Sequence, residues 1–111
     1  MQKEDGFKEL PILENFIENQ VRAEQIEVIA PKKNQEFNLG ASLTFEWKSG
    51  LMDSLNLVIF DNNANIIFEE KIGKTYQFSK QLKKGLYYWQ LETHKESLFT
   101  GKFKLVNLIR R

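Results

Sequence analysis

The spacing of apolar residues changes once along this chain, from the period of a helix to the period of a β-strand. The apolar residues of the first segment recur at three- and four-residue steps: Ile12, Leu13, Phe16, Ile17 and Val21. This spacing lines them up on one side of a helix. Pro11 suits the first helical position, where its missing N–H costs no hydrogen bond. The pattern predicts a short amphipathic helix over residues 11–22.

Beyond residue 25, apolar and polar residues alternate in short runs separated by turn residues. The clearest run places Leu43, Phe45 and Trp47 on one face and polar residues on the other, which is typical of a half-buried strand. Seven such runs predict strands over residues 26–30, 43–48, 55–60, 65–72, 75–82, 87–93 and 98–106. The stretch 34–41 between the first two strands is predicted to be a loop.

Short strands with a turn roughly every ten residues, and no second helix, are the signature of a β-sandwich. We therefore predict an all-β fold, a seven-stranded antiparallel sandwich with a short N-terminal α-helix. Residues 1–24 form the N-terminal extension that carries the helix, and residues 25–111 form the sandwich. Nine phenylalanines, three tyrosines and two tryptophans favour the same class, because aromatic residues fit a half-buried pleated surface.

Composition removes several classes of function. The net charge is +1, from 16 basic and 15 acidic side chains, so no overall positive field attracts nucleic acid. The chain contains no cysteine, which excludes disulfides, thiolate catalysis and cysteine metal sites. Its longest apolar runs have about four residues, whereas a membrane span needs about 20. We expect no nucleic-acid partner and no membrane insertion by this segment.

Two motifs together resemble a known fold. Trp47 lies in LTFEWK on the second predicted strand, and LKKGLYYWQL (residues 82–91) opens the sixth. They resemble fibronectin type III and related immunoglobulin-like domains of bacterial type, over about residues 25–107. In these domains the second strand carries a core tryptophan, and the sixth follows an L-x-x-G turn and bears a "tyrosine corner". The resemblance implies an immunoglobulin-like sandwich. Tyr87 or Tyr88 could form the corner, and alternation with Trp89 favours Tyr87.

Three sequence features resemble parts of catalytic or ligand-binding motifs, and none of them has all the residues that its motif requires. His94 is the single histidine, and it is predicted to be a solvated loop residue because triads and zinc sites need a base or further ligands beside it. Gly73-Lys74-Thr75 lacks the earlier glycine of a phosphate-binding loop. Asp61-x-Asn63-x-Asn65 lacks the glycine and glutamate of a calcium loop and suits a hairpin turn. We predict no catalytic residue, no metal site, no cofactor and no enzyme activity.

The candidate partner surface combines the helix with the outer face of the sheet. Trp47 and Trp89 alternate with other apolar residues and are predicted to lie in the core, whereas Tyr88 should point outward, available for contact. The candidate surface residues are Leu13, Phe16, Ile17, Val58, Phe60 and Tyr88. An apolar helix stripe needs cover. Either the helix packs on this sheet face, or both surfaces meet a partner or a second copy of the chain. A third hypothesis is that the helix is a frayed stalk.

The resemblance implies a non-catalytic protein-interaction or structural module. Such domains bind through end loops, here residues 49–54 and 93–97, or through a sheet face or edge strand. We expect a protein partner or further domains of a parent protein, with a homodimer as a further hypothesis. The resemblance favours the extracytoplasmic, periplasmic or cell-surface C-terminal domain of a membrane-anchored bacterial protein. The alternative is a carbohydrate-binding module of β-sandwich type, which would need exposed aromatic residues around Tyr88.

Overall fold

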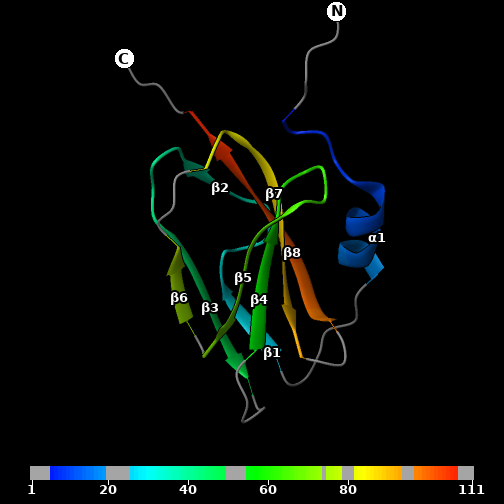
Figure 1. The fold of residues 1–111 in the computed structure, drawn as a ribbon, viewed down its shortest axis with the longest axis vertical. Helices are drawn as coiled ribbons and strands as arrows, with labels where there is room; N and C mark the ends of the chain where they lie inside the picture. Colours follow the sequence, from blue (N-terminus) through cyan, green and yellow to red (C-terminus); the bar gives the residue numbers. More distant parts are fainter. Residues whose placement is uncertain are drawn as a thin grey trace, which may run out of the picture.

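The computed structural model describes residues 6–19, 26–49, 55–73, 75–78, 82–93 and 97–107. In these residues two β-sheets pack face to face, and one helix covers the outside of the larger sheet (Figure 1). The smaller sheet has the order β1 (Ile26–Ala30), β3 (Leu43–Ser49) and β6 (Thr75–Phe78). The larger sheet has the order β2 (Gln35–Asn38), β8 (Ser97–Val106), β7 (Gly85–Glu92), β4 (Leu55–Phe60) and β5 (Ile66–Ile72). The helix is α1 (Pro11–Asn19).

The predicted sandwich is confirmed, but the prediction of seven antiparallel strands is wrong. The described residues form eight strands, and β2 runs parallel to β8. β2 lies inside the stretch 34–41 that was predicted to be a loop. The prediction missed this strand because Phe37 is its single apolar residue, and because its partner strand lies near the other end of the chain. Phe37 packs edge-on against Phe103, with 6.0 Å between the ring centroids.

The predicted element boundaries hold to within a few residues where the structure describes them. α1 begins at the predicted Pro11 and ends at Asn19, and residues 20–22 of the predicted helix lie outside the described residues. β4 has the predicted bounds, whereas β7 begins two residues earlier than predicted, at Gly85. The predicted strand 75–82 is described as strand only to Phe78.

The core lies between the two sheets and is built from alternating apolar residues of facing strands. Its buried members on β3, β4, β7 and β8 are Leu43, Phe45, Trp47, Leu55, Leu57, Ile59, Tyr87, Trp89, Leu91, Phe103 and Leu105. Trp47 and Trp89 are 2% and 1% exposed, which confirms their prediction as core residues. Phe45 packs edge-on against Trp89 and Phe103, at centroid distances of 5.1 and 5.8 Å. Each such ring removes about 150–250 Å² from water.

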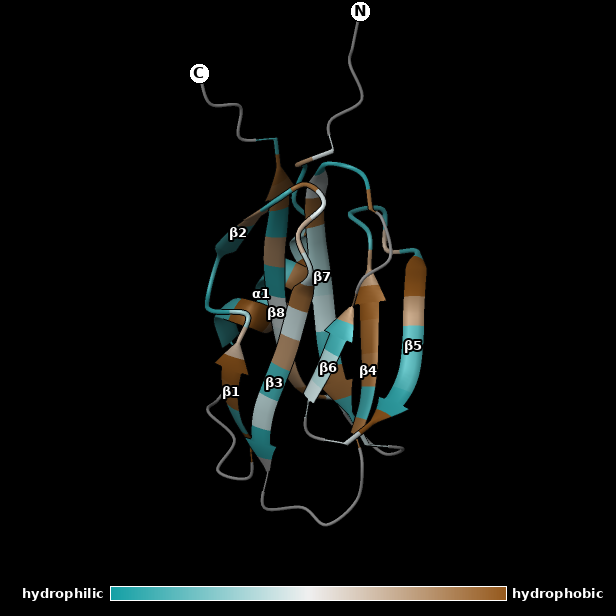
Figure 2. Cartoon of the chain, turned by 90° about the vertical axis from the view of Figure 1, so that its left-hand side faces the viewer, coloured by the Kyte–Doolittle hydropathy of each residue, from teal (hydrophilic) through white to brown (hydrophobic). Residues whose placement is uncertain are grey.

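Hydropathy (Figure 2) and burial together distinguish the strands with one covered face from those with two. β3 alternates between apolar and polar residues, as expected for a strand with one face in solvent. β4 is apolar along most of its length, and both faces are buried over Leu57–Ile59. β7 is buried from Gly85 to Leu91 without interruption. For β7, the second covered face lies under α1 and the segment that precedes it.

Tyr87 forms the corner at the start of β7, as predicted. Its hydroxyl donates a 2.6 Å hydrogen bond to the backbone oxygen of Lys83. Its ring stacks on Phe103 in the core, with 5.5 Å between centroids and 15° between the ring planes. The polar end of Tyr87 therefore closes the turn before β7, while the apolar ring attaches that turn to the core.

We expect Tyr87→Phe to lower the free energy of unfolding by about 1 kcal/mol, because it removes this hydrogen bond and keeps the ring. Denaturation followed by circular dichroism measures the loss. Tyr76→Phe is the matched control, because no hydrogen bond joins the Tyr76 hydroxyl to another described residue. The control should change stability by less than about 0.5 kcal/mol. Equal losses in the two variants would show that the corner bond contributes nothing.

Candidate functional site

α1 packs on the outer face of the five-stranded sheet, beside β7 and β8 (Figure 1). Leu13 is buried against Leu86 and Tyr88 of β7. Phe7, Leu10, Ile17 and Phe60 surround this cluster and are partly buried. Of the three hypotheses for the helix, the structure shows the first: the helix covers the sheet face within the same chain.

The structure brings together four of the six residues predicted as a partner surface. These four are Leu13, Ile17, Phe60 and Tyr88, which meet under α1. Phe16 points away from the sheet and is 52% exposed, and Val58 is buried outside the cluster, opposite Gln90 on β7. The prediction that Tyr88 is available for contact is wrong: it does lie on the outer face, but the helix reduces its exposure to 0%. In this arrangement neither Tyr88 nor Val58 can contact a partner.

The Tyr88 hydroxyl holds α1 through a short polar network. It accepts a 3.0 Å hydrogen bond from the backbone N–H of Leu10 and donates a 2.6 Å bond to Oε2 of Glu14. Nζ of Lys102 on β8 lies 2.9 Å from both carboxylate oxygens of Glu14 and 3.6 Å from Oε2 of Glu9. No sequence pattern indicated this network, because Glu14, Tyr88 and Lys102 lie far apart along the chain.

Burial and hydrogen bonding act in opposite directions on these groups. Burial alone would raise the pKa of Glu14, but the hydrogen bonds from Tyr88 and Lys102 outweigh it and hold the pKa below its ordinary value of 4.5. The pKa of Tyr88 is raised far above its ordinary value, by burial and by its bond to the Glu14 carboxylate. Glu14 is therefore anionic and Tyr88 neutral near neutral pH, which is the pairing that a charge-assisted hydrogen bond needs.

Further backbone contacts attach the segment before α1 to the sandwich. The carbonyl oxygen of Gly6 accepts a 2.8 Å hydrogen bond from the N–H of Leu86, and that of Lys8 accepts a 3.0 Å bond from Nδ2 of Asn62. A Cβ atom on Gly85 would lie 2.8 Å from the Gly6 oxygen. Gly85, which the sequence analysis assigned to the turn before β7, is thus also the residue that lets the N-terminal segment approach.

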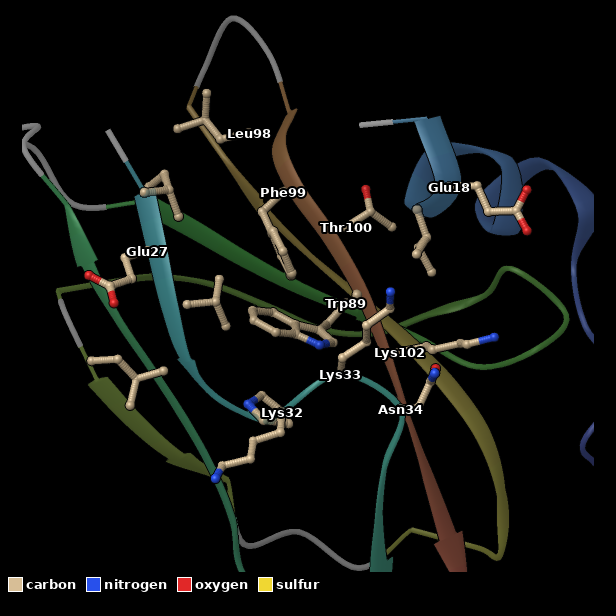
Figure 3. Close-up of a pocket in the computed structure, with 16 residues that line it drawn as sticks. Glu18, Glu27, Lys32, Lys33, Asn34, Trp89, Leu98, Phe99, Thr100 and Lys102 are labelled. Carbon is tan, nitrogen blue, oxygen red and sulfur yellow. The ribbon is translucent and has the colours of Figure 1, made fainter. Parts of the chain in front are cut away.

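A groove of about 1050 Å³ opens between β1, the loop after it and β8, next to the end of α1 (Figure 3). Its floor contains the rings of Trp89 and Phe99, whose centroids lie 5.1 Å apart. Gly101 lies opposite Trp89 on β8, and a Cβ atom there would lie 2.7 Å from Nε1 of the indole. The missing side chain at residue 101 therefore leaves room for the Trp89 ring on the groove floor. Trp89 was predicted only as a core residue, and no sequence pattern indicated this groove.

The rim of the groove is charged. Lys32 and Lys33 lie on the loop after β1, and both are exposed. Lys102 lines the groove as well, so the residue that holds Glu14 also belongs to this second site. Glu27 on β1 and Glu18 on α1 lie on opposite sides of the opening (Figure 3). The groove thus combines an aromatic floor with ionic groups at its mouth.

The other candidate sites of the sequence contribute no chemistry in the described residues. Oδ1 of Asp61 accepts hydrogen bonds of 2.9 Å from the N–H groups of Asn63 and Asn65, as predicted for a hairpin turn. Burial alone would raise the pKa of Asp61, but these bonds outweigh it and lower the pKa. His94 and residues 50–54 lie outside the described residues. In the part of the chain that the structure covers, no three His, Asp or Glu side chains are placed to hold a metal ion.

No helix within the described ranges has the length and apolar content that crossing a bilayer requires.

Comparison with known proteins bears on the fold. No family model matches this chain, and no curated protein has a similar sequence. A solved structure of the fibronectin(III)-like modules of CbhA from Clostridium thermocellum is similar, with 11% sequence identity and a TM-score of 0.47. The match covers 78% of this chain and 99% of that chain. The chain has an immunoglobulin-like, fibronectin type III-like fold, as its own two sheets and tyrosine corner indicate.

We expect Leu13→Ala to destabilise the protein by roughly 2–3 kcal/mol, because it leaves a cavity over Leu86 and Tyr88. Ile12→Ala on the same helix is the matched control: Ile12 is 71% exposed, so its loss should stay within about 0.5 kcal/mol. Urea unfolding compares the two variants. Similar values for both would mean that α1 does not rest on the sheet.

We expect the acid side of the stability profile to depend on Glu14. Because its pKa is lowered in the folded state, the ionised carboxylate stabilises the fold above pH 4.5, and this contribution is lost as the pH falls through the lowered pKa. Glu14→Gln should therefore be less stable than the parent protein near neutral pH, by roughly 1.5–3 kcal/mol. The two stabilities should converge in acid.

Urea unfolding at a series of values between about pH 3 and pH 7 measures this difference. Glu18→Gln, which alters an exposed glutamate of the same helix, is the control and should change stability near neutral pH by less than about 0.5 kcal/mol. A constant gap between Glu14→Gln and the parent across the series would contradict the role of the Glu14 charge.

Proposed function

We propose that this chain is a non-catalytic protein-interaction module that holds a segment of a partner protein in the groove between β1 and β8. The observation that supports this proposal is the groove itself. It places the edge of two strands, an aromatic floor and charged groups at one opening. Binding sites in proteins commonly combine apolar contact area with a few polar groups that orient the ligand. The outer sheet face, which was the first candidate surface, is already covered by α1.

The described ionisable groups support binding rather than catalysis. Acid–base chemistry uses groups with shifted pKa values that face a cleft. Here the shifted carboxylates serve the fold: Glu14 holds α1, and Asp61 holds the turn between β4 and β5. Oε2 of Glu69 accepts a 2.9 Å hydrogen bond from Nδ2 of Asn56 on the neighbouring strand. Glu14, Asp61 and Glu69 are therefore held by hydrogen bonds that belong to the fold.

The alternative is a carbohydrate-binding module of β-sandwich type. Such a module stacks sugar rings on exposed aromatic faces, and the sequence placed these around Tyr88. Among the described aromatic side chains only Phe16 is exposed, at 52%, and Tyr88 is fully covered. This distribution favours a protein partner over a sugar.

The proposal also includes the setting of the domain. We propose an extracytoplasmic domain at the C-terminal end of a membrane-anchored bacterial protein, by analogy with bacterial modules of this fold. The partner is then another protein or a neighbouring domain of the parent protein. A second copy of the chain is a further candidate, and Ile12 and Phe16 on the exposed side of α1 are where it would dock. Sedimentation equilibrium distinguishes the monomer from the dimer.

Selection from a phage-displayed library of random peptides tests the proposed function, with a glycan array probed in parallel. We expect enriched peptides whose binding follows a saturable isotherm with the parent protein. The binding should be lost when Ile29→Arg places a long charged side chain at the groove mouth, because Ile29 lines the groove and is 36% exposed. Ile66→Arg, at an exposed position on β5 away from the groove, is the matched control and should bind normally.

Saturable glycan binding without any enriched peptide would replace the proposed function with the carbohydrate alternative. Peptides that bind the Ile29→Arg protein as tightly as the parent would show that the groove is not the binding site.

A further inference from the structure

The groove carries a more specific inference, which rests on the proposed function. We infer that its ligand is an extended acidic polypeptide segment that lies along the free edge of β1 and sets its carboxylates against Lys32 and Lys33. Three independent features of the groove support this ligand: its backbone edges, its floor and its charges.

The first feature is that strand edges, rather than strand faces, border the groove. Side chains of consecutive strand residues point to opposite faces, yet Ile26, Glu27, Val28 and Ile29 all line the groove. Five consecutive residues of β8, Leu98–Lys102, line its other side. A cavity lined by consecutive residues of a strand, whose side chains point to opposite faces, lies along the edge of that strand. This geometry suits a ligand in extended conformation.

The edge of β1 can receive such a ligand. β1 is the terminal strand of its sheet and pairs only with β3 among the described strands. A terminal strand presents unpaired N–H and C=O groups, which an added strand can satisfy. The register of β1 shifts after Val28, and Pro31 follows the strand. The regular edge therefore spans Ile26–Val28, long enough for one short paired stretch of a peptide.

The second feature is the floor. Trp89 and Phe99 contribute two rings in contact. Trp89 is only 1% exposed and fills the space left by the missing side chain of Gly101, so the accessible ring of the floor is that of Phe99, which is half-buried. An apolar side chain of a bound segment would find aromatic surface at this point, beyond the backbone contacts with β1. Alternate side chains of an extended peptide point to one side, so apolar residues at every second position would match this floor.

The third feature is the charge at one end of the groove. Lys32 and Lys33 are both exposed, and neither makes an ion pair with another described residue. The N–H of Lys32 donates a 2.8 Å hydrogen bond to Oε1 of Gln35, which holds the loop that presents both lysines. Figure 3 shows both lysines near Trp89, whereas Glu27 lies farther along β1. Because Lys102 is already neutralised by Glu14, these two lysines are the cations left for a ligand.

The test measures binding of labelled peptides of about nine residues by fluorescence polarisation. The first peptide has three glutamates at one end followed by alternating valine and threonine, and it is made in both chain directions. The second has lysines in place of the glutamates. The third is the acidic peptide with prolines in its alternating part, which removes N–H donors and prevents strand pairing.

We expect the acidic peptide to bind at least tenfold more tightly than the other two. The double variant Lys32→Glu/Lys33→Glu should weaken its binding about tenfold or more, and should favour the lysine peptide instead. Lys83→Glu/Lys84→Glu changes a second exposed lysine pair, outside the groove, and is the matched control with parent-like binding. The urea midpoints of the two double variants show that both remain folded.

A second readout locates the bound peptide. The chain has two tryptophans, so its two indole N–H signals in a ¹H–¹⁵N spectrum report on Trp89 in the groove and on Trp47 in the core. We expect the acidic peptide to shift the Trp89 signal and to leave the Trp47 signal in place.

Equal loss of binding in the two lysine variants, or a peptide that shifts neither indole signal, would overturn the inference. Failure of the acidic peptide to bind would overturn it as well. Library peptides of another composition that still bind in the groove would leave the proposed function standing, so the two failures are distinguishable.

Discussion

The hydroxyl group of Tyr88 joins the two parts of this chain. It accepts a hydrogen bond from the backbone just before α1 and donates one to Glu14 in the first turns of the helix. Apolar contact alone is non-directional and would let a short helix slide or rotate on a sheet. Two bonds to one buried oxygen remove that freedom. The same oxygen would lose both partners if the helix left, and a buried unsatisfied hydroxyl is costly.

This attachment turns a two-layer sandwich into a locally three-layered structure, with the five-stranded sheet in the middle. β7 is consequently buried on both faces, which an antiparallel strand in a simple sandwich is not. The groove proposed for a partner lies elsewhere, at the edges of the sheets. Lys102 links the two regions: it binds Glu14 under the helix and also lines the groove between β1 and β8. The position of α1 therefore helps to shape the groove.

Period-two patterns along the sequence predicted most of the strands, because burial on one face imposes them directly. Tyr87 could be assigned to the corner because its neighbours two residues apart, including Trp89, face inward. β2 could not be predicted, since a four-residue strand with one apolar residue has no pattern above background. Long-range polar contacts were also out of reach. Alternation correctly places Tyr88 on the outer face, but it does not reveal that Glu14 approaches from 74 positions away.

The groove was missed for a related reason. Its lining comes from strand edges and from a glycine, and neither carries a hydrophobic signature. Gly101 is informative only once its register opposite Trp89 is known. Lys32 and Lys33 were visible as a pair, but a pair of lysines in a sequence is usually a solvated surface. They become a candidate binding feature because the fold places them beside the groove floor and the edge of β1.

The contacts of the N-terminal segment have a consequence for the order of events during synthesis. Leu10, Glu14 and Lys8 bond to residues 78, 74 and 54 positions later in the chain. α1 is therefore made first, but its binding surface does not exist until β7 has emerged and paired. Closing such long loops is slow compared with forming local structure. We expect the helix to dock last, as the step that completes the domain, and the nascent chain to carry an uncovered apolar stripe until then.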